Sequence, residues 1–404
     1  MISFQLRLRA LCLAACAAVG PMWARADGIT SFAVFGKNGV NITGGAQVTS
    51  GIVGSNANVN VGTFSVLVGG AAGGGDFNTP SVNPGSSYLV GPTTFNGNVY
   101  LGSFVTLSGP LNAGGDAMFG SSLKTNYDIN AGGNFTASFT NINANVHAGI
   151  DATLTSSLDQ MTGNISGNHN VEVEGVLNGN VRYGNTLKTG PFTNISGSVT
   201  KGTTPVTPLA YVPKVVPAAD VFTSGGATVT NGGSAAAPLA PGSYGSLGFP
   251  SFADLYIGPG NYYFKDLAFN GKTSLHLVNI GGANKVHIYS TGDISGTLFF
   301  PTINGLGFDQ ADPRLGANVL LETLGNYTLD SSMDGTIFAP NGSITLGSFD
   351  TINGSLIAGN TVNSGSVTVN YVAPGEVAYA VPEPASLSLL ALAIPMLVRR
   401  RRQG

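Results

Sequence analysis

Charge is scarce in this sequence. Only 17 of the 404 residues are Lys or Arg and 20 are Asp or Glu, so charged residues make up 9%, against about 25% in ordinary globular proteins. The lack of a basic excess disfavours a nucleic-acid partner, and a hydrophobic content of 43% excludes a disordered polyampholyte. Good helix formers are few, whereas Gly supplies 59 positions and Asn 36, which disfavours helices. Without a strict three-residue glycine period, collagen is excluded too.

Residues 1–26 have the pattern of a secretory signal peptide, which we expect to be a short helix. Arg7 and Arg9 form its basic start, and residues 10–23 are nearly all apolar. Ala24 and Ala26 flank Arg25 in an A-x-A cleavage motif. The sequence therefore predicts export, with a mature chain that begins at Asp27.

Cysteine is nearly absent, because Cys12 and Cys16 are the only two and both lie in the signal segment. The mature chain must then be held together by burial and hydrogen bonds without disulfides, and cysteine-ligated metal sites are excluded. Residues 13–16 read Leu-Ala-Ala-Cys and also match a lipoprotein box, which would make Cys16 a lipidated N-terminus. The short apolar stretch between Arg9 and Cys16 favours simple cleavage instead.

The C-terminus contains three features in order: a Pro-rich motif at 381–386, an apolar segment at 385–398 and an arginine cluster at 399–402. The motif residues are Val381, Pro382, Glu383, Pro384, Ala385 and Ser386, and the cluster is Arg399, Arg400, Arg401 and Arg402. The apolar segment of 14 residues is shorter than the roughly 20 that span a bilayer, so it crosses only if the bilayer thins and the arginines snorkel. Cytoplasmic arginines would place residues 27–380 outside the membrane.

This tail resembles the PEP-CTERM sorting signal of Gram-negative bacteria over about 24 residues. The resemblance implies that an exosortase-type membrane enzyme processes the tail, and that the protein reaches the cell surface or extracellular matrix. The alternative is an ordinary single-span anchor, but a short helix interrupted by Pro395 favours the sorting signal. Such a signal gives an address and says nothing of activity.

The body has the period-two alternation of short β-strands, bounded by Gly and Asn. Segments 98–115 and 343–360 align without a gap, and both contain the element Leu-Gly-Ser-Phe; Val-Gly-Thr-Phe at 61–64 is a variant of it. A second series places Ala-Gly at 113, 131 and 148, with spacings of 18 and 17 residues. This spacing suits one coil of a parallel β-helix, with Gly and Asn at the corners. A β-sandwich of hairpins is the alternative.

We expect a mostly β protein with a solenoid-like body, a signal helix and a single short C-terminal transmembrane helix. The body divides into an N-terminal solenoid region at 27–200, a Pro/Gly-rich linker or crossover at 201–250 and a C-terminal solenoid region at 251–375. Residues 376–404 form the spacer and the sorting tail. The sequence leaves open whether the two strand-rich regions stack into one solenoid.

The body is also similar to the choice-of-anchor A domain, an adhesin module. The segments that carry the similarity are Phe-Ala-Val-Phe-Gly at 32–36, Gly-Thr-Ile-Phe-Ala-Pro-Asn at 335–341 and Ile-Asn-Gly-Ser-Leu-Ile-Ala at 352–358. The resemblance covers about two thirds of residues 27–375 and implies an adhesive or matrix role. It provides no catalytic residues.

The sequence offers little chemistry. No two of the four histidines, His147, His169, His276 and His287, have the spacing of a metal site, and each is expected on a strand face. Asp309, Asp312 and Glu322 are the best candidates for acid–base groups or calcium ligands. Residues 330–334 and Glu172-x-Glu174 carry weaker calcium signals. We predict no catalytic residue and no cofactor, with calcium as the weak exception.

These observations predict a non-enzymatic surface or matrix protein of a Gram-negative bacterium, with an adhesive or structural role in biofilm. Its expected partners are the sorting enzyme, extracellular polysaccharide and other copies of itself. Between residues 27 and 380, nineteen acids outnumber ten bases, which suits divalent cations that bridge to acidic polysaccharide. The main alternative is a β-helix enzyme that acts on polysaccharide. An ice- or mineral-binding protein would need an even threonine ladder, and Thr43, Thr49, Thr93 and Thr94 are not evenly spaced.

Overall fold

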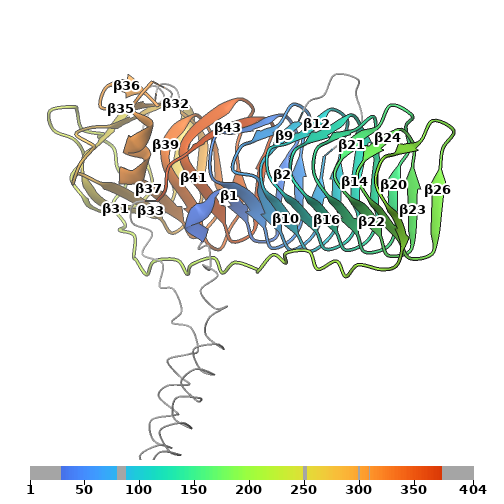
Figure 1. Ribbon diagram of the computed structural model, residues 1–404. Helices are drawn as coiled ribbons and strands as arrows, with labels where there is room; N and C mark the ends of the chain where they lie inside the picture. Colours follow the sequence, from blue (N-terminus) through green and yellow to red (C-terminus); the bar gives the residue numbers. More distant parts are fainter. Residues whose placement is uncertain (1–28, 80–87, 249–252, 299–300, 309, 375–404) are drawn as a thin grey trace, which may run out of the picture.

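The computed structural model describes residues 29–374, except 80–87, 249–252, 299–300 and 309. The signal segment, its cleavage site, the motif at 381–386 and the arginine cluster lie outside the described residues. The described chain winds into a parallel β-solenoid whose short strands stack into three faces (Figure 1). The expectation of a mostly β solenoid is thereby confirmed, and the hairpin sandwich is wrong.

Face A takes one strand from each coil. In order along the solenoid, its strands are β29 (Gly242–Ser243), β31 (Gly260–Phe264), β33 (Val286–Ser290), β37 (Val319–Thr323), β39 (Met333–Ala339), β41 (Asp350–Ala358), β1 (Phe32–Gly36), β4 (Ile52–Ser55), β7 (Ala71–Gly73), β10 (Thr93–Phe95), β13 (Leu111–Ala113), β16 (Ile129–Ala131), β19 (Val146–Ala148), β22 (Ile165–Gly167), β25 (Val181–Tyr183) and β28 (Val199–Lys201).

Face B runs beside face A in the same direction. Its strands are β32 (Leu267–Leu277), β34 (Ile294–Leu298), β38 (Tyr327–Asp330), β40 (Ile344–Thr345), β42 (Thr361–Ser364), β2 (Gly39–Ile42), β5 (Val59–Val61), β8 (Phe77–Asn78), β11 (Val99–Leu101), β14 (Ala117–Ser121), β17 (Phe135–Ser138), β20 (Ala152–Leu154), β23 (Asn170–Val173) and β26 (Thr186–Thr189).

Face C closes the coil and also takes the second half of β32 and the first halves of β39 and β41. Its other strands are β30 (Asp254–Ile257), β35 (Thr302–Ile303), β43 (Val367–Tyr371), β3 (Ala46–Val48), β6 (Val66–Leu67), β9 (Tyr88–Val90), β12 (Val105–Leu107), β15 (Leu123–Thr125), β18 (Asn141–Ile142), β21 (Gln160–Thr162), β24 (Val176–Asn178) and β27 (Asn194–Ile195). A short hairpin partner, β36 (Leu306–Gly307), pairs antiparallel with β35.

The two strand-rich regions stack into one solenoid, in an order that the sequence does not suggest. Strand β1 lies between β4 of its own region and β41 of the C-terminal region. The chain therefore starts at mid-length, winds to one end at β28, and restarts at the opposite end near β29. It then winds back toward its own beginning, where the hydroxyl of Tyr371 donates a hydrogen bond to the carbonyl of Thr30.

The coil length matches the sequence repeat, because Ala113, Ala131 and Ala148 pair in register on face A. Inward side chains alternate with outward ones along nearly every short strand, and the inward ones form one continuous apolar core. Each coil is too small to bury its own apolar face, so stability comes from stacking on its neighbours. The only helices among the described residues are two short 3-10 helices, η2 (Ile29–Ser31) and η3 (Pro313–Asn318).

Residues 202–220 connect the two ends of the solenoid as an extended crossover along face A (Figure 1). The solenoid resumes with the bridged segment Val229–Leu247 and β29. The crossover covers a second apolar cluster, which lies outside the solenoid core. The cluster contains Ile29, Phe32, Phe35, Tyr211, Leu320, Phe338 and Ile357. Gly54 belongs to the same contact, because an added Cβ there would lie 2.2 Å from the ring of Phe32.

Asparagine side chains bind the crossover to the coils. The amide of Asn56 donates to the carbonyl of Lys214 at 2.7 Å and accepts from its N–H at 2.7 Å. Asn96, two coils further along, makes the same pair of bonds with Tyr211 at 2.9 and 2.8 Å. Two coils span roughly 9.6 Å, and three residues of polyproline-like chain span about 9.3 Å. The prolines of the crossover thus keep it in step with alternate coils.

The Asn56 contact provides a test of this arrangement. Asn56→Ala removes both bonds to Lys214 and the bond from the Tyr211 hydroxyl at 2.9 Å, and we expect a loss of about 1–3 kcal/mol. Protease cleavage between residues 209 and 216 should become faster, which mass spectrometry of the fragments would detect. Asn141→Ala, on face C, is the matched control and should leave cleavage unchanged. Equal cleavage in both variants would contradict the role of Asn56.

Candidate functional site

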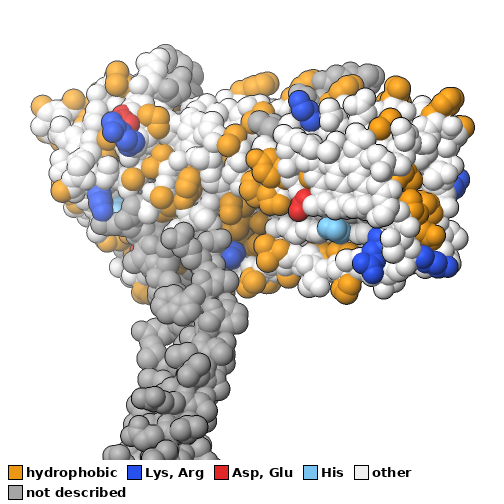
Figure 2. Space-filling view, viewed as in Figure 1, with side chains coloured by type: hydrophobic (Ala, Val, Ile, Leu, Met, Phe, Trp, Pro, Cys, Tyr) orange, Lys and Arg blue, Asp and Glu red, His pale blue; other side chains and the backbone are white. Residues whose placement is uncertain are grey.

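The surface available to a partner is uneven around the coil. The crossover covers part of face A, whereas faces B and C keep their outward side chains free of it. Most of the visible surface is neutral, and charged side chains are scattered over it (Figure 2). The regular rows of polar side chains lie at the corners between the faces and on face B.

Two of the three corners carry rows of side-chain amides and carboxylates. In each row, a side-chain oxygen accepts a hydrogen bond from the backbone N–H of the next row member, one coil further along. These bonds satisfy corner N–H groups that no strand ladder reaches. The row between faces A and B is Asn58, Asp76, Asn98, Asp116, Asn134, Asp151 and Asn170, and the row between faces C and A is Asp128, Asn145, Asn164, Asn180 and Ser198.

The outward side of face B adds a third row. Asn363, Asn41, Asn60 and Asn78 donate and accept amide hydrogen bonds from coil to coil at 2.7–3.1 Å. Such amide ladders stabilise stacked strands. They also present a regular series of uncharged polar groups to solvent.

The acidic candidates from the sequence do not come together. Asp309 lies outside the described residues. Asp312 caps η3, and its hydrogen bonds from Arg314 lower the pKa of Asp312 to about 2. Glu322 lies on β37, buried on face A. Asp312 is thus an ionised partner of Arg314, and it forms no acid–base pair with Glu322.

Glu322 binds the end of the crossover. The backbone N–H of Asp220 donates to its Oε1 at 2.8 Å. Burial is the main reason that the pKa of Glu322 rises to about 7, and the charge of Asp220 adds to the rise. On the neighbouring strand, Tyr289 pairs in register with Glu322, stacks on Tyr263 and meets Phe222 at a tilted angle. This buried carboxyl group therefore holds the end of the crossover.

The weaker calcium candidates are also separate from one another. Asp334 is buried and accepts a hydrogen bond from Asn353, whereas Glu172 forms an ion pair with Lys188 on face B. Over the part of the chain that the structure describes, no group of three or more His, Cys, Asp or Glu side chains is placed to hold a metal ion.

The histidines lie on or beside strand faces. His147 contacts the hydroxyl of Ser166 at 2.8 Å, His169 contacts Asp151 at 3.2 Å, and His287 contacts the hydroxyl of Tyr289 at 3.3 Å. The sequence expectation holds for His147, His276 and His287, which lie in strands, whereas His169 directly precedes β23.

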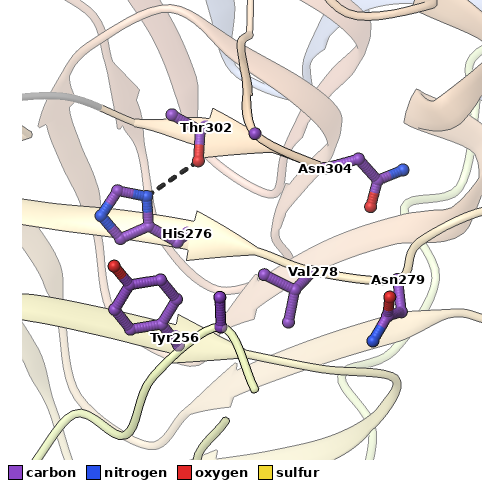
Figure 3. A pocket seen from close by; sticks show the side chains of 8 residues that line it. Tyr256, His276, Val278, Asn279, Thr302 and Asn304 are labelled. Carbon is purple, nitrogen blue, oxygen red and sulfur yellow. Dashed lines mark hydrogen bonds between the residues drawn. The ribbon is translucent and has the colours of Figure 1, made fainter. Parts of the chain in front are cut away.

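His276 differs because it lines a cavity of about 640 Å³ near the β29 end (Figure 3). Its Nδ1 lies 2.8 Å from Oγ1 of Thr302, and its Nε2 lies 3.1 Å from Oδ1 of Asp254. The ring stacks on Tyr256 at 4.5 Å between centroids. Figure 3 shows Asn279 and Asn304 further along the same cavity. No sequence pattern pointed to this group, because its members come from three different coils.

The solenoid end at β26, β27 and β28 is open. Each of these strands pairs with a single neighbour among the described strands, so one edge of each is unpaired. Lys188 and Lys201 lie on β26 and β28. Unpaired edges favour association with another chain, and lysines on them limit that association.

Comparison of the sequence with models of protein families and with curated proteins gives no match. Among solved structures, the chain is similar to an ice-binding protein from an Antarctic bacterium of the Flavobacteriaceae, with 14% identity and a TM-score of 0.22. The alignment covers 86% of this chain and 97% of that chain. Within the described ranges, no helix is long and apolar enough to cross a bilayer.

The raised pKa of Glu322 leads to a test by pH. A carboxyl whose pKa rises from 4.5 to about 7 on folding stabilises the fold fully below its unfolded pKa, and this contribution disappears as pH rises through about 7. We expect Glu322→Gln to raise the melting temperature by several degrees at about pH 8 and to have little effect at about pH 4. Calorimetry over this range would measure it.

Asp312→Asn is the matched control, since the pKa of Asp312 is lowered to about 2 and the group stays ionised above about pH 5. It should leave the slope of melting temperature against pH unchanged in that range. A wild-type slope that persists in Glu322→Gln would show that another group causes it.

Proposed function

We propose that this chain is an exported, exosortase-sorted protein of the cell surface or extracellular matrix, with an adhesive or structural role in biofilm and no catalytic centre. The observation that carries the proposal is the combination of the tripartite tail at 381–402 with a long solenoid of neutral polar faces. Stacked coils repeat the same groups at regular spacing. Many weak contacts to a repeating polymer then add up to firm binding.

The position of the chain ends supports attachment at mid-length. Ile29 packs under face A, and Tyr371 contacts Thr30 nearby. The described chain therefore ends beside the corner between faces C and A, away from the corner between faces B and C. Attached in this way, the protein keeps both solenoid ends and its opposite corner free for partners.

Two partners suit the surface, namely extracellular polysaccharide along the polar faces and a second copy at the open end. Polysaccharide matches the uncharged amides and hydroxyls of faces B and C. A second copy matches the unpaired edges of β26, β27 and β28. Calcium could bridge acidic groups to acidic polysaccharide, and calcium dependence of adhesion would test that contribution.

The cavity around His276 favours a second candidate function, a β-helix enzyme acting on extracellular polysaccharide. The contacts of His276 to Asp254 and Thr302 would let the imidazole exchange a proton. Cleavage of polysaccharide by the purified protein, lost in His276→Ala, would support this candidate. Activity lost in Asp312→Ala instead would place the chemistry at η3.

The sorting proposal makes a prediction about both chain ends. In protein isolated from cells, we expect an N-terminus at Asp27 and a C-terminus that lacks residues 399–402, as measured by mass spectrometry of the intact chain. A variant with Pro382, Glu383 and Pro384 replaced by alanine should keep its arginines and stay with the membrane fraction. Surface protein that retains Arg399–Arg402 would contradict processing of the tail.

A further inference from the structure

The third corner, between faces B and C, differs from the two amide corners. Seven described residues other than glycine have positive φ, and four of them are Phe64, Phe104, Phe139 and Phe349, with φ from 53° to 71°. This left-handed backbone is strained for phenylalanine and suits glycine or asparagine, in a chain that uses Gly and Asn freely elsewhere.

These four residues, which we call the aromatic corner row, occupy equivalent positions on different coils. Each directly precedes or nearly precedes a face C strand, and the strand registers align them. Phe64, Phe104 and Phe139 are two coils apart, and Phe349 lies three coils before Phe64. The Leu-Gly-Ser-Phe repeat supplies Phe104 and Phe349, and its variant Val-Gly-Thr-Phe supplies Phe64, whereas Phe139 follows Thr-Ala-Ser.

Packing does not explain the rings. Their exposed fractions lie between 45% and 85%. These four residues therefore have a strained backbone although their side chains gain little from burial. Strained residues of this kind occur where a surface binds something. Leu158, in the position after Phe139 along the row, is 67% exposed as well.

The surroundings indicate a neutral, linear partner. The nearest outward side chains are amides and hydroxyls, including Asn60 and Asn78 on face B and Thr106 and Asn141 on face C, with Lys124 as a single charge among the face C positions aligned with Thr106. At the Phe139 end, a hollow of about 310 Å³ on face C is lined by Asn141, Gln160 and Asn178, among others.

A folded protein is a poor fit, because a stable interface buries about 800 Å² on each partner, centred on contiguous apolar contacts. Here the rings are isolated and stand roughly 10 Å apart where two coils separate them. That interval is comparable with the repeat of two sugar rings in an extended β-linked polysaccharide. The C–H face of a sugar stacks on an aromatic ring, and its hydroxyls bind the amides between.

We propose that the aromatic corner row binds an extended, neutral, β-linked polysaccharide along the solenoid axis. This deepens the proposed function and rests on it for orientation, since the row lies away from the place near Tyr371 where the described chain ends. A polysaccharide bound to this row would lie on the side of the protein that faces away from its attachment.

The test compares the exported protein with a triple variant, Phe64→Asn, Phe104→Asn and Phe139→Asn. Asparagine accepts positive φ, so the melting temperature should stay the same or rise. In affinity electrophoresis with hydroxyethylcellulose, we expect the dissociation constant to increase about tenfold or more, since several weak contacts are lost together. Tyr127→Asn, at an exposed aromatic residue between β15 and β16 at the corner between faces C and A, is the matched control and should bind like the wild type.

A triple Phe→Tyr variant at the same positions keeps the rings and should retain binding, which separates stacking from folding. The proposal is overturned if the wild type does not bind hydroxyethylcellulose, if it binds alginate alone, or if the triple Asn variant binds as tightly as the wild type. It is also overturned if the triple Asn variant melts well below the wild type, because the rings would then serve packing.

This outcome is independent of the cell-based test. If the row fails while native protein is still processed and found at the surface, the proposed function stands without this site. If the protein is never exported, the sorting proposal fails whatever the purified chain binds.

Discussion

Hydrogen bonding between successive coils is the constraint on which the rest of this structure depends. A coil of about 18 residues is too short to enclose a core, so each strand away from the solenoid ends relies on the strands above and below it for its backbone partners. This requirement fixes the register at nearly every coil. It also explains much of the composition, because the corners use Asn or Asp to satisfy the N–H groups that the strands leave over. They use Gly where a Cβ would collide with the backbone of the next coil, as at Gly114 and Gly132.

The crossover is the second constraint on the structure. It allows the C-terminal region to stack ahead of the N-terminal region, against their order in the sequence. Because the C-terminal region stacks before the N-terminal one, the chain must return along the whole solenoid. Asn56 and Asn96 bind it by paired amide bonds, and Tyr211 buries its ring in the outer apolar cluster. The return also occupies part of face A, so partners are left with faces B and C and the corner between them.

The polar rows and the aromatic corner row have different structural roles on this scaffold. The amide corners and the Asn row of face B satisfy backbone groups and hold coils together, whereas the aromatic corner row satisfies none of these needs. The buried carboxyl of Glu322 belongs to the first category despite its raised pKa, because it holds the crossover. The raised pKa of this carboxyl group therefore follows from its structural role at the end of the crossover.

Local sequence determined the coil. The 17- and 18-residue spacing of the Ala-Gly series, the Gly/Asn corners and the alternation of short strands all concern neighbours along the chain or one coil away, and each predicted the structure that forms. The Leu-Gly-Ser-Phe repeat was visible too, but its meaning was not, because backbone torsion and exposure appear only in three dimensions. The order of the two regions, the path of the crossover and the group around His276 were decided by tertiary structure alone. They depend on pairings between segments far apart in the chain, and no local pattern records which distant edge a strand will pair with.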